Sequence, residues 1–140
     1  MKIVLSLLVG LGIAVAAVAG ASANPGRDAI LAALAAEAKK ADPAFAGFSA
    51  ERGQAFWTAT HPGGKPDTPS CTTCHTVDPT KAGQTRVGKA IDPMAVSATP
   101  DRFSDPEKVA KWFQRNCNSV LGRDCTAIEK GDVITYLSSK

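Results

Sequence analysis

Large side chains are scarce in this chain of 140 residues. Aromatic residues make up only 6% of it, as five phenylalanines, two tryptophans and one tyrosine. A core with so few large side chains is thin, or is filled in part by something other than protein. Hydrophobic residues nevertheless reach 44%, which is too apolar for a disordered chain. The length suits one small domain.

A strong excess of either charge is also missing. Lysine and arginine number 16 and aspartate and glutamate 13, so the formal net charge is +3. No run of basic residues is longer than Lys39-Lys40. A charge this weak and this dispersed does not predict nucleic-acid binding.

Beyond its N-terminus, the chain has no apolar run long enough to cross a membrane. At the N-terminus, Lys2 precedes an apolar stretch at 3–18, and an A-x-A cleavage site follows at 21–23. This pattern predicts a secretory signal peptide, residues 1–23, whose cleavage leaves one domain, residues 24–140. An N-terminal membrane anchor is the alternative, but the stretch is short and no stop-transfer flank follows it. We therefore expect an exported, soluble, periplasmic protein with no stable membrane insertion after cleavage.

Helical periodicity predicts an all-α protein of about four helices. Ser104 with Glu107, and Thr126 with Glu129, have the spacing of capping boxes that open helices. No segment is predicted to be a strand. An irregular stretch, 61–103, holds six prolines and four glycines, and loops this long in a compact domain tend to be functional. The expected helices are 27–40, 50–60, 104–116 and 126–138.

The pentapeptide C-T-T-C-H at 71–75 carries the clearest chemical signal. This is the attachment signature of a c-type haem, in which Cys71 and Cys74 add to the two vinyl groups of one porphyrin and His75 becomes the fifth ligand of the iron. The predicted signal peptide makes this assignment more specific, because haem c is attached outside the cytoplasm. One covalently bound haem c would also supply the apolar volume that the core lacks.

Two other uses of these cysteines have to be weighed. A C-x-x-C redox dithiol would need a βαβ context, which the sequence does not show. A structural zinc site would need two more ligands at short spacing, for which Cys117 and Cys125 are the remaining cysteines. In an exported protein, however, the default for Cys117 and Cys125 is a disulfide, which would hold the turn between the last two helices.

The sixth ligand of the iron decides the function, because a strong ligand makes an electron carrier and a weak one leaves a site for small molecules. Met94 is a common type of ligand in small cytochromes c, but it follows His75 by only 19 residues. His61 lies in a loop beside proline and glycine, where a histidine is usually solvated. Asn116 ends the third predicted helix, and its amide oxygen would hold ferric iron better than ferrous iron. Spacing alone does not decide which of these three residues is the sixth ligand. Asn116 could instead cap the C-terminus of its helix, without any contact with iron.

Several segments together resemble the sphaeroides haem protein (SHP) family, a branch of the class I cytochromes c. The resemblance covers about residues 51–137. It implies the class I cytochrome c fold around one haem c, with Asn116 as a labile sixth ligand and a disulfide between Cys117 and Cys125 beside it. The segments that carry it are 63–75, 82–86, 97–103, 115–120, 122–126 and 129–130.

The resemblance also implies a function. In that family, reduction opens the iron to oxygen and nitric oxide, and a dihaem cytochrome c is the electron donor. We therefore expect a monohaem cytochrome that transfers electrons and binds diatomic gases reversibly after Asn116 dissociates. A conventional carrier with His75 and Met94 as permanent ligands is the alternative. Turnover of peroxide or nitric oxide would be a third function, but no distal histidine or arginine is identifiable as a general acid or base, so an enzyme is not predicted.

In a class I fold the N-terminal and C-terminal helices cross closely. Gly53 and Trp57 should then meet Tyr136 or Leu137. Such a contact would explain a glycine inside a helix, where it costs about 1 kcal/mol against alanine. Basic residues of the long loop are candidates for contacts with the haem propionates or with a docking partner: Lys65, Arg86 and Lys89.

Overall fold

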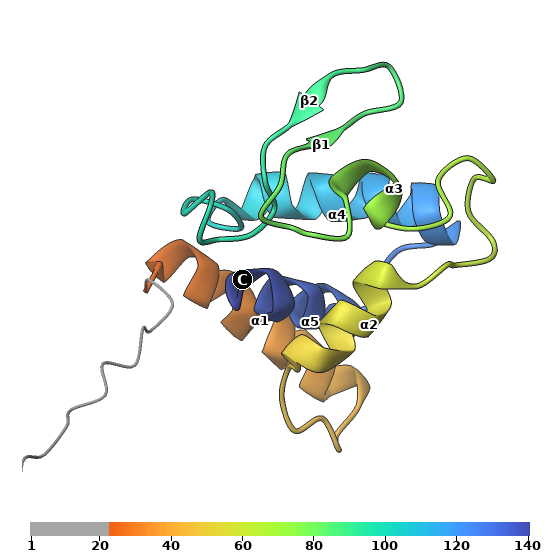
Figure 1. Cartoon of the computed structure of the whole chain (residues 1–140). Helices are drawn as coiled ribbons and strands as arrows, with labels where there is room; N and C mark the ends of the chain where they lie inside the picture. The colour runs from red at the N-terminus through yellow and green to blue at the C-terminus, as the bar shows by residue number, and fades with distance from the viewer. Residues whose placement is uncertain (1–22) are drawn as a thin grey trace, which may run out of the picture.

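The computed structural model describes residues 23–140, which form five helices and one very small hairpin (Figure 1). The predicted signal peptide lies outside the described residues, except for residue 23. Within the described part, no helix is both long enough and apolar enough to pass through a membrane. The helices are α1 (Pro25–Ala41), α2 (Ala50–Thr58), α3 (Thr72–His75), α4 (Pro106–Leu121) and α5 (Ala127–Ser138), and the strands are β1 (Gly83–Gln84) and β2 (Ala90–Ile91).

The all-α expectation is confirmed, with two small differences in the stretch 61–103, where α3 adds a fifth helix to the four expected and the strands form a hairpin. β1 and β2 pair antiparallel, with Gly83 opposite Ile91, where no strand was expected. Thr85 closes the turn, because its N–H donates to the carbonyl of Lys89 at 2.8 Å and its hydroxyl accepts from the N–H of Lys89 at 3.0 Å. Gly88 in the turn has a φ of +81°, which glycine adopts without strain. Strands of two residues are too short to show an alternating pattern.

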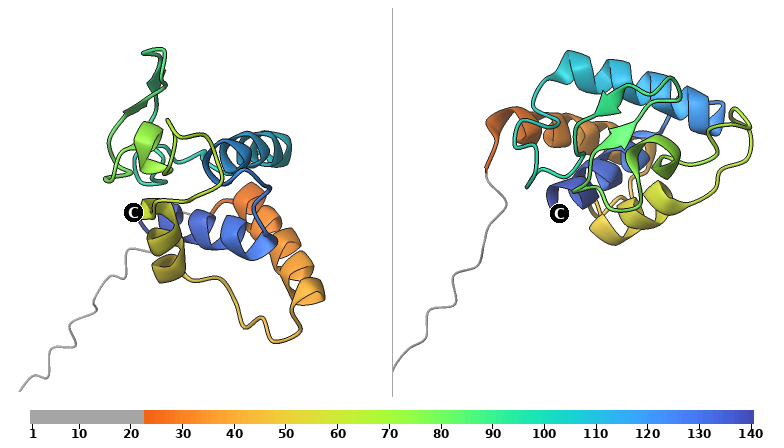
Figure 2. Two further views of the ribbon diagram at one scale, coloured as in Figure 1. Left: turned by 90° about the vertical axis from the view of Figure 1, so that its right-hand side faces the viewer. Right: turned by 45° about the horizontal axis from the view of Figure 1, so that its top comes forward.

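The helices lie in two groups. α1 and α2 both pack on α5, and these three form the lower part of the molecule in Figure 1. α3, the hairpin and α4 lie above them, and in the left view of Figure 2 α3 and α4 stand apart on opposite sides. Within residues 23–140, α4 makes no extensive contact with another helix. The upper part of the molecule is therefore built mainly from loop segments.

The start of α4 differs by one residue from the prediction. Asp105, not Ser104, is the N-cap, and its carboxylate accepts from the N–H of Lys108 at 3.0 Å. Aspartate caps a helix as well as serine does, and the residue before a proline prefers an extended backbone, which suits a cap. The second predicted capping box, formed by Thr126 and Glu129 at the start of α5, is confirmed.

The end of α4 also differs from the prediction. The helix was expected to end near Asn116 but continues to Leu121, where Gly122 in the left-handed conformation ends it. The extension buries Cys117 and Val120 on the inner face of the helix. Asn116 is therefore inside the helix and is not a C-cap.

α2 and α5 cross at Gly53. A Cβ atom there would collide with the carbonyl of Asp132 and with the Cβ of Tyr136, so only glycine lets the two backbones come this close. One turn later, Trp57 is buried in a cluster with Tyr136 and Leu137. The expected contact of Gly53 and Trp57 with Tyr136 and Leu137 is thereby confirmed.

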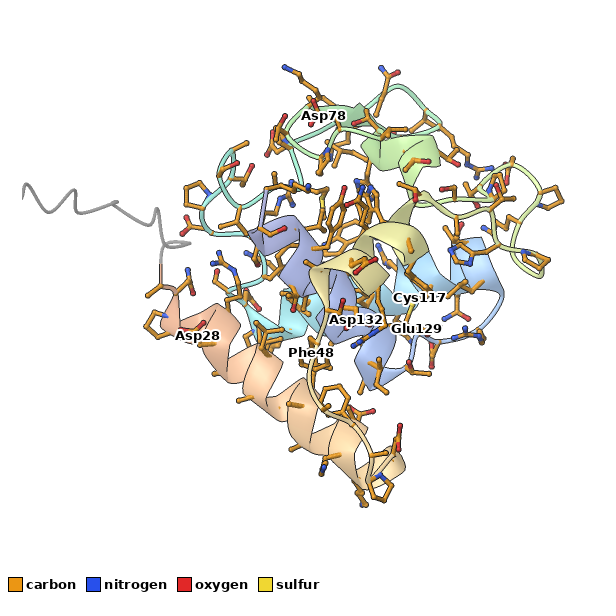
Figure 3. The ribbon with its side chains drawn as sticks, turned by 60° about the horizontal axis from the view of Figure 1, so that its bottom comes forward. Asp28, Phe48, Asp78, Cys117, Glu129 and Asp132 are labelled. Carbon is orange, nitrogen blue, oxygen red and sulfur yellow. A yellow bond between two sulfur atoms is a disulfide. The ribbon has the colours of Figure 1, made fainter. Side chains whose placement is uncertain are left out.

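The same crossing contains a buried carboxylate. Asp132 is 4% exposed and accepts from the N–H of Ser49 and from Nε of Arg52, each at 2.7 Å. Beside it, the ring of Phe48 lies against Gly131 of α5, and Figure 3 labels Phe48 and Asp132 in this region. A buried charge is tolerated when it is paired and hydrogen-bonded. Asp132 therefore fixes where α2 starts relative to α5.

Gly53→Ala should destabilise the protein by at least about 2 kcal/mol, because the added methyl group would force the two helix backbones apart. Urea unfolding of the holoprotein followed by circular dichroism measures this loss. The control is Gln54→Ala on the exposed side of α2, which should change the free energy of unfolding by less than about 0.5 kcal/mol. Equal stability of the two variants would show that the close crossing is not required.

Candidate haem site

The residues of the C-x-x-C-H motif come from a single helical turn. α3 spans Thr72–His75, with Cys71 as its N-cap, and the N–H of His75 donates to the carbonyl of Cys71 at 3.1 Å. Cys71 and Cys74 are free thiols and are half-buried. Burial raises the pKa of the Cys71 thiol to about 11, so this thiol is protonated at neutral pH. Two thiols three residues apart, with an imidazole next to the second, form the donor set for attachment of haem c.

The His75 imidazole has a buried nitrogen without a partner. Its Nδ1 atom makes no hydrogen bond within the described residues. Burial, and after it the positive charge of Arg102, lowers the pKa of His75 to about 4, so the ring is neutral. Leaving a buried polar atom unbonded costs about 1–3 kcal/mol, and such an atom calls for a functional reason. A neutral imidazole is the form that binds a metal, so this residue fits the haem iron that the motif predicts.

Trp57 connects the imidazole to the core. Its ring centroid lies 5.4 Å from that of His75, and its Nε1 donates to the carbonyl of Thr76 at 3.4 Å. Thr76 has a φ of 65° and a ψ of 165°, a combination that essentially only glycine adopts easily. The hydroxyl of Thr76 donates to the carbonyl of Asp78 at 2.6 Å. The residue that follows His75 is therefore strained and is held in place from two sides.

The loop before Cys71 is fastened to the end of α4. The N–H of Lys65 donates to the carbonyl of Ser119 at 2.7 Å, and the Thr68 hydroxyl lies 2.9 Å from the Ser119 hydroxyl. Gly64 packs so tightly on the same turn of α4 that a Cβ atom would collide with its backbone. The thiol-bearing helix α3 is thus linked through this loop to α4.

The hairpin packs against α3 on another side. Gly83 of β1 lies on the backbone of α3, where a Cβ atom would collide with the carbonyl of Cys74. Between α3 and the hairpin is an open hollow of about 620 Å³. At its rim, Arg86 forms an ion pair with Asp67, so this candidate for a propionate contact already has a carboxylate partner. The hollow is lined by Thr73, Cys74, Thr76 and residues 82–86.

Asn116 presents a free amide on α4. It is exposed, and its side chain makes no hydrogen bond to another residue of the described chain. Asn118 is different, because its Nδ2 donates to the carbonyl of Gln114 at 2.8 Å and to the carboxylate of Asp124 at 2.7 Å. Trp112, four residues before Asn116 and on the same face, is 52% exposed. The ring of Trp112 is contacted by the cations of Lys111 and Arg115, at 5.9 and 5.5 Å from its centroid, whereas the amide of Asn116 has no partner within residues 23–140.

Cys117 forms a disulfide with Cys125, with their Cα atoms 5.6 Å apart, and both residues are buried. Because both sulfurs are in the disulfide, neither is available as the zinc ligand considered above. Arg123 braces the same turn, because its guanidinium donates to the two carboxylate oxygens of Glu129 at 2.8 and 2.7 Å. Glu129 also accepts from the N–H of Thr126 at 2.8 Å. Figure 3 labels Cys117 and Glu129 at this junction of α4 and α5.

The two other candidates for the sixth ligand are engaged elsewhere. Met94 packs against the cluster that contains Trp57, and its N–H donates to the carbonyl of Pro79 at 2.9 Å. Its side chain is therefore part of the core packing. His61 has its Nε2 2.9 Å from the carbonyl of Phe56, to which it donates.

The predicted site residues thus fall into two groups. The motif residues lie on α3, and Asn116 with the disulfide lies on α4, the two helices that stand apart in the left view of Figure 2. Sequence reasoning missed the roles of Trp57 and Arg102 next to His75. Trp57 is recognisable in the sequence as a core residue of a helix, and Arg102 is one of several charges in a loop. Their proximity to His75 arises only from tertiary contacts.

Comparison with known proteins identifies the family. Residues 43–137 match the model of a family described as a domain of unknown function, DUF1924. The cytochrome c-type protein SHP of Cereibacter sphaeroides is 63% identical to this chain over 91 residues, which are 65% of this chain and 70% of that protein. The chain belongs to the SHP family of c-type cytochromes. The resemblance seen in the motifs is confirmed, and the cofactor of this SHP-family chain is covalently attached haem c.

Solved structures show the same fold. The structure of oxidised SHP, described as an oxygen binding cytochrome c, has a TM-score of 0.76 at 52% identity and covers 84% of this chain and 100% of its own. Oxidised cytochrome c'' from Methylophilus methylotrophus has a TM-score of 0.67 at 31% identity, over 80% of this chain and 92% of its own. By sequence, cytochrome c'' is 42% identical over 69 residues, which are 49% of this chain and 48% of that protein. The roles of the individual haem ligands stay predictions.

Glu129→Gln should weaken the junction of α4 and α5 in a pH-dependent way. The Arg123 guanidinium holds the pKa of Glu129 below its usual range. A carboxylate with a lowered pKa stabilises the fold above its ordinary pKa of about 4.3, and this contribution disappears as the pH falls through the lower folded-state pKa. We expect the variant to lose about 1 kcal/mol of unfolding free energy at neutral pH and progressively less in acid.

Urea unfolding from about pH 7 down to about pH 3 measures this difference. Glu37→Gln, at an exposed position of α1, is the control and should have a small and nearly constant effect. A loss for Glu129→Gln that is the same at every pH would contradict an electrostatic role of the Arg123 pair.

Proposed function

We propose that this chain, after cleavage of residues 1–23, is a periplasmic monohaem cytochrome of the SHP type that transfers electrons and reversibly binds a diatomic gas, oxygen or nitric oxide. Its electron donor would be a dihaem cytochrome c or another periplasmic redox protein. The observation that carries the proposal is the free amide of Asn116. In addition, a relative of solved structure is described as an oxygen binding cytochrome c. Haem c supplies an iron that cycles between ferric and ferrous states and binds a gas where a coordination position is open.

Each site residue has its own part in this proposal. Cys71 and Cys74 would hold the porphyrin through thioether bonds. His75, supported by Trp57, would give its neutral imidazole to the iron. Asn116 would give an amide oxygen to the iron as a second protein ligand. Oxygen donors suit the harder ferric ion better than the softer ferrous ion. Asn116 would therefore bind the ferrous iron weakly, and its dissociation on reduction would leave a position for the gas.

The contacts around Asn116 support this use. The amide of Asn116 has no hydrogen-bond partner in the described chain, whereas the amide of Asn118 has two. The disulfide of Cys117 holds the backbone directly after Asn116. An uncommitted side chain on a fixed backbone can bind, leave and return without disturbing other bonds.

The position of Met94 argues against a conventional carrier. Met94 packs against the core cluster that contains Trp57 and Leu137, so its side chain already has a place within the protein. Asn116 has no comparable role within the described chain, and its helix α4 stands apart from α3 in Figure 2, so Asn116 is the better candidate for the sixth ligand.

The absorption spectra of the exported holoprotein, oxidised and reduced, with and without carbon monoxide, test the proposal. We expect a high-spin reduced spectrum that shifts promptly when carbon monoxide is added. Asn116→Ala should change the oxidised spectrum, because it removes the ferric ligand, and should leave the reduced carbon monoxide complex unchanged. The matched control is Asn118→Ala on the same helix, which should leave both spectra as in the parent protein.

Two further variants separate the alternatives. Met94→Leu and His61→Ala should leave the reduced spectrum and the response to carbon monoxide unchanged. A low-spin reduced spectrum indifferent to carbon monoxide, which Met94→Leu converts into a responsive one, would contradict the proposal. It would establish a conventional electron carrier instead.

A further inference from the structure

One side of α4 carries only positive charges. Lys108, Lys111 and Arg115 recur at i, i+3 and i+7, so they form one stripe along the helix, and all three are exposed. Asp105, the N-cap, lies 3.5 Å from the ammonium of Lys108. Glu107 is the acidic residue of α4, and it forms no ion pair within residues 23–140. The stripe therefore keeps the charges of Lys111 and Arg115 unpaired.

Arg115 differs from every other arginine of the described chain. It forms neither a hydrogen bond nor an ion pair with another residue of the stretch 23–140. Arg27 donates to the carbonyl of Arg102 at 3.1 Å, and Arg102 donates to the carbonyl of Pro93 at 3.0 Å. The remaining arginines pair with carboxylates: Arg52, Arg86 and Arg123. The planar fork of Arg115, which suits a carboxylate, is thus left for a group from outside the chain.

Trp112 lies between this stripe and Asn116. Its ring is 52% exposed, and the charged groups of Lys111 and Arg115 lie 5.9 and 5.5 Å from its centroid. Trp112 and Asn116 are four residues apart and share the neighbouring face of the helix. Tryptophan and arginine are the residue types that contribute most to binding at protein interfaces. A partner bound to Trp112 is therefore one helical turn from the residue proposed to bind the iron.

The extent and the sign of the stripe indicate what binds to it. From Lys108 to Arg115 the helix rises by about 10 Å, which is too long for one small anion. Two copies of this chain that met through the same stripe would bring like charges together, which is unfavourable. A protein surface that bears several carboxylates fits the stripe instead. α4 lies at the outside of the molecule in both views of Figure 2, where such a surface can reach it.

We propose that the basic side of α4, formed by Lys108, Lys111, Trp112 and Arg115, is the docking surface for the acidic face of the redox protein that donates the electron. Arg115 binds a carboxylate of the donor, and Trp112 packs at the centre of the contact. The proposal rests on the electron transfer proposed above and names the surface at which the electron arrives. It does not depend on gas binding or on the identity of the sixth ligand.

Reduction of the ferric holoprotein by reduced flavodoxin, an acidic electron-transfer protein, tests this surface. One electron passes from the flavin to the ferric iron, and stopped-flow absorption of the haem gives the second-order rate constant. The double variant Lys111→Glu/Arg115→Glu should lower this constant by about tenfold or more at low ionic strength, because it replaces attraction by repulsion. The loss should become small in about 0.5 M salt, which screens the charges.

The matched control is Lys39→Glu/Lys40→Glu at the end of α1. It changes the net charge by the same amount and should lower the rate constant by less than about threefold, because these lysines lie outside the docking surface. Equal losses in the two double variants would show that only the net charge matters and would overturn the proposal. A rate constant of Lys111→Glu/Arg115→Glu that equals that of the parent at every salt concentration would overturn it as well.

Single variants test the part played by Arg115. Arg115→Lys keeps the charge and loses the planar fork, so it should slow reduction less than Arg115→Gln does. Equal rates for the parent and Arg115→Gln would overturn the carboxylate contact. Haem content and midpoint potential are measured for each variant, and a slower reduction that follows from either would also count against docking. Should Lys111→Glu/Arg115→Glu fail to retain haem, Lys111→Gln/Arg115→Gln should show a smaller loss with the same salt dependence.

Two further results separate this proposal from its alternatives. Sedimentation velocity should show a parent protein that is monomeric. A dimer that Lys111→Glu/Arg115→Glu dissociates, without a change in the rate of reduction, would assign this side of α4 to a second copy of the chain and overturn the proposal. A parent protein that ignores carbon monoxide contradicts the proposed gas binding alone, because flavodoxin reduces the ferric protein before any gas binds.

Discussion

The close crossing of α2 and α5 at Gly53 is the constraint on which the site depends. Because a glycine lets the two backbones touch, Trp57 enters the core one turn later and reaches the His75 ring. The same tryptophan donates to the carbonyl of Thr76 and so helps to hold the strained backbone after the histidine. The orientation of the imidazole is therefore set by the packing of two helices that lie below it and bear no ligand themselves.

The two sides of the proposed site differ in how their polar groups are used. On the His75 side, Trp57 and Arg102 make hydrogen bonds that fix the surrounding backbone, and the pKa of the imidazole is lowered by burial and by a nearby cation. On the α4 side, the amide of Asn116 makes no hydrogen bond within residues 23–140, and Trp112 is contacted by Lys111 and Arg115 of its own helix. The helices below form a core of their own, while the upper part has little protein to fill it. A covalently held haem completes that half of the molecule, which accounts for the small number of aromatic residues.

Local signals in the sequence were sufficient for much of this fold. Spacing identified the C-x-x-C-H motif, and capping and periodicity located the helices, because both depend on residues close together in the chain. The end of α4 was misplaced because Asn116 can cap a helix, whereas the buried face extending to Val120 decides the outcome. The hairpin and the contact of Arg27 with Arg102 had no signal, since each depends on partners that only the folded chain brings together. Arg27 and Arg102, for example, are 75 residues apart.

α4 is held in place by contacts at both of its ends. At its start, Ser104 lies against Gly26, and at its end, Ser119 is bonded to the loop that precedes α3. Between these ends, Phe113 packs against the core cluster formed by α2 and α5, whereas Asn116 is exposed. A helix fixed in this way does not shift as a whole, so the ligand exchange proposed for Asn116 would need only the rotation of one side chain. Such rotations take picoseconds to nanoseconds, whereas movements of whole helices take microseconds or longer. The opening of the site would then follow the arrival of the electron without delay from the polypeptide.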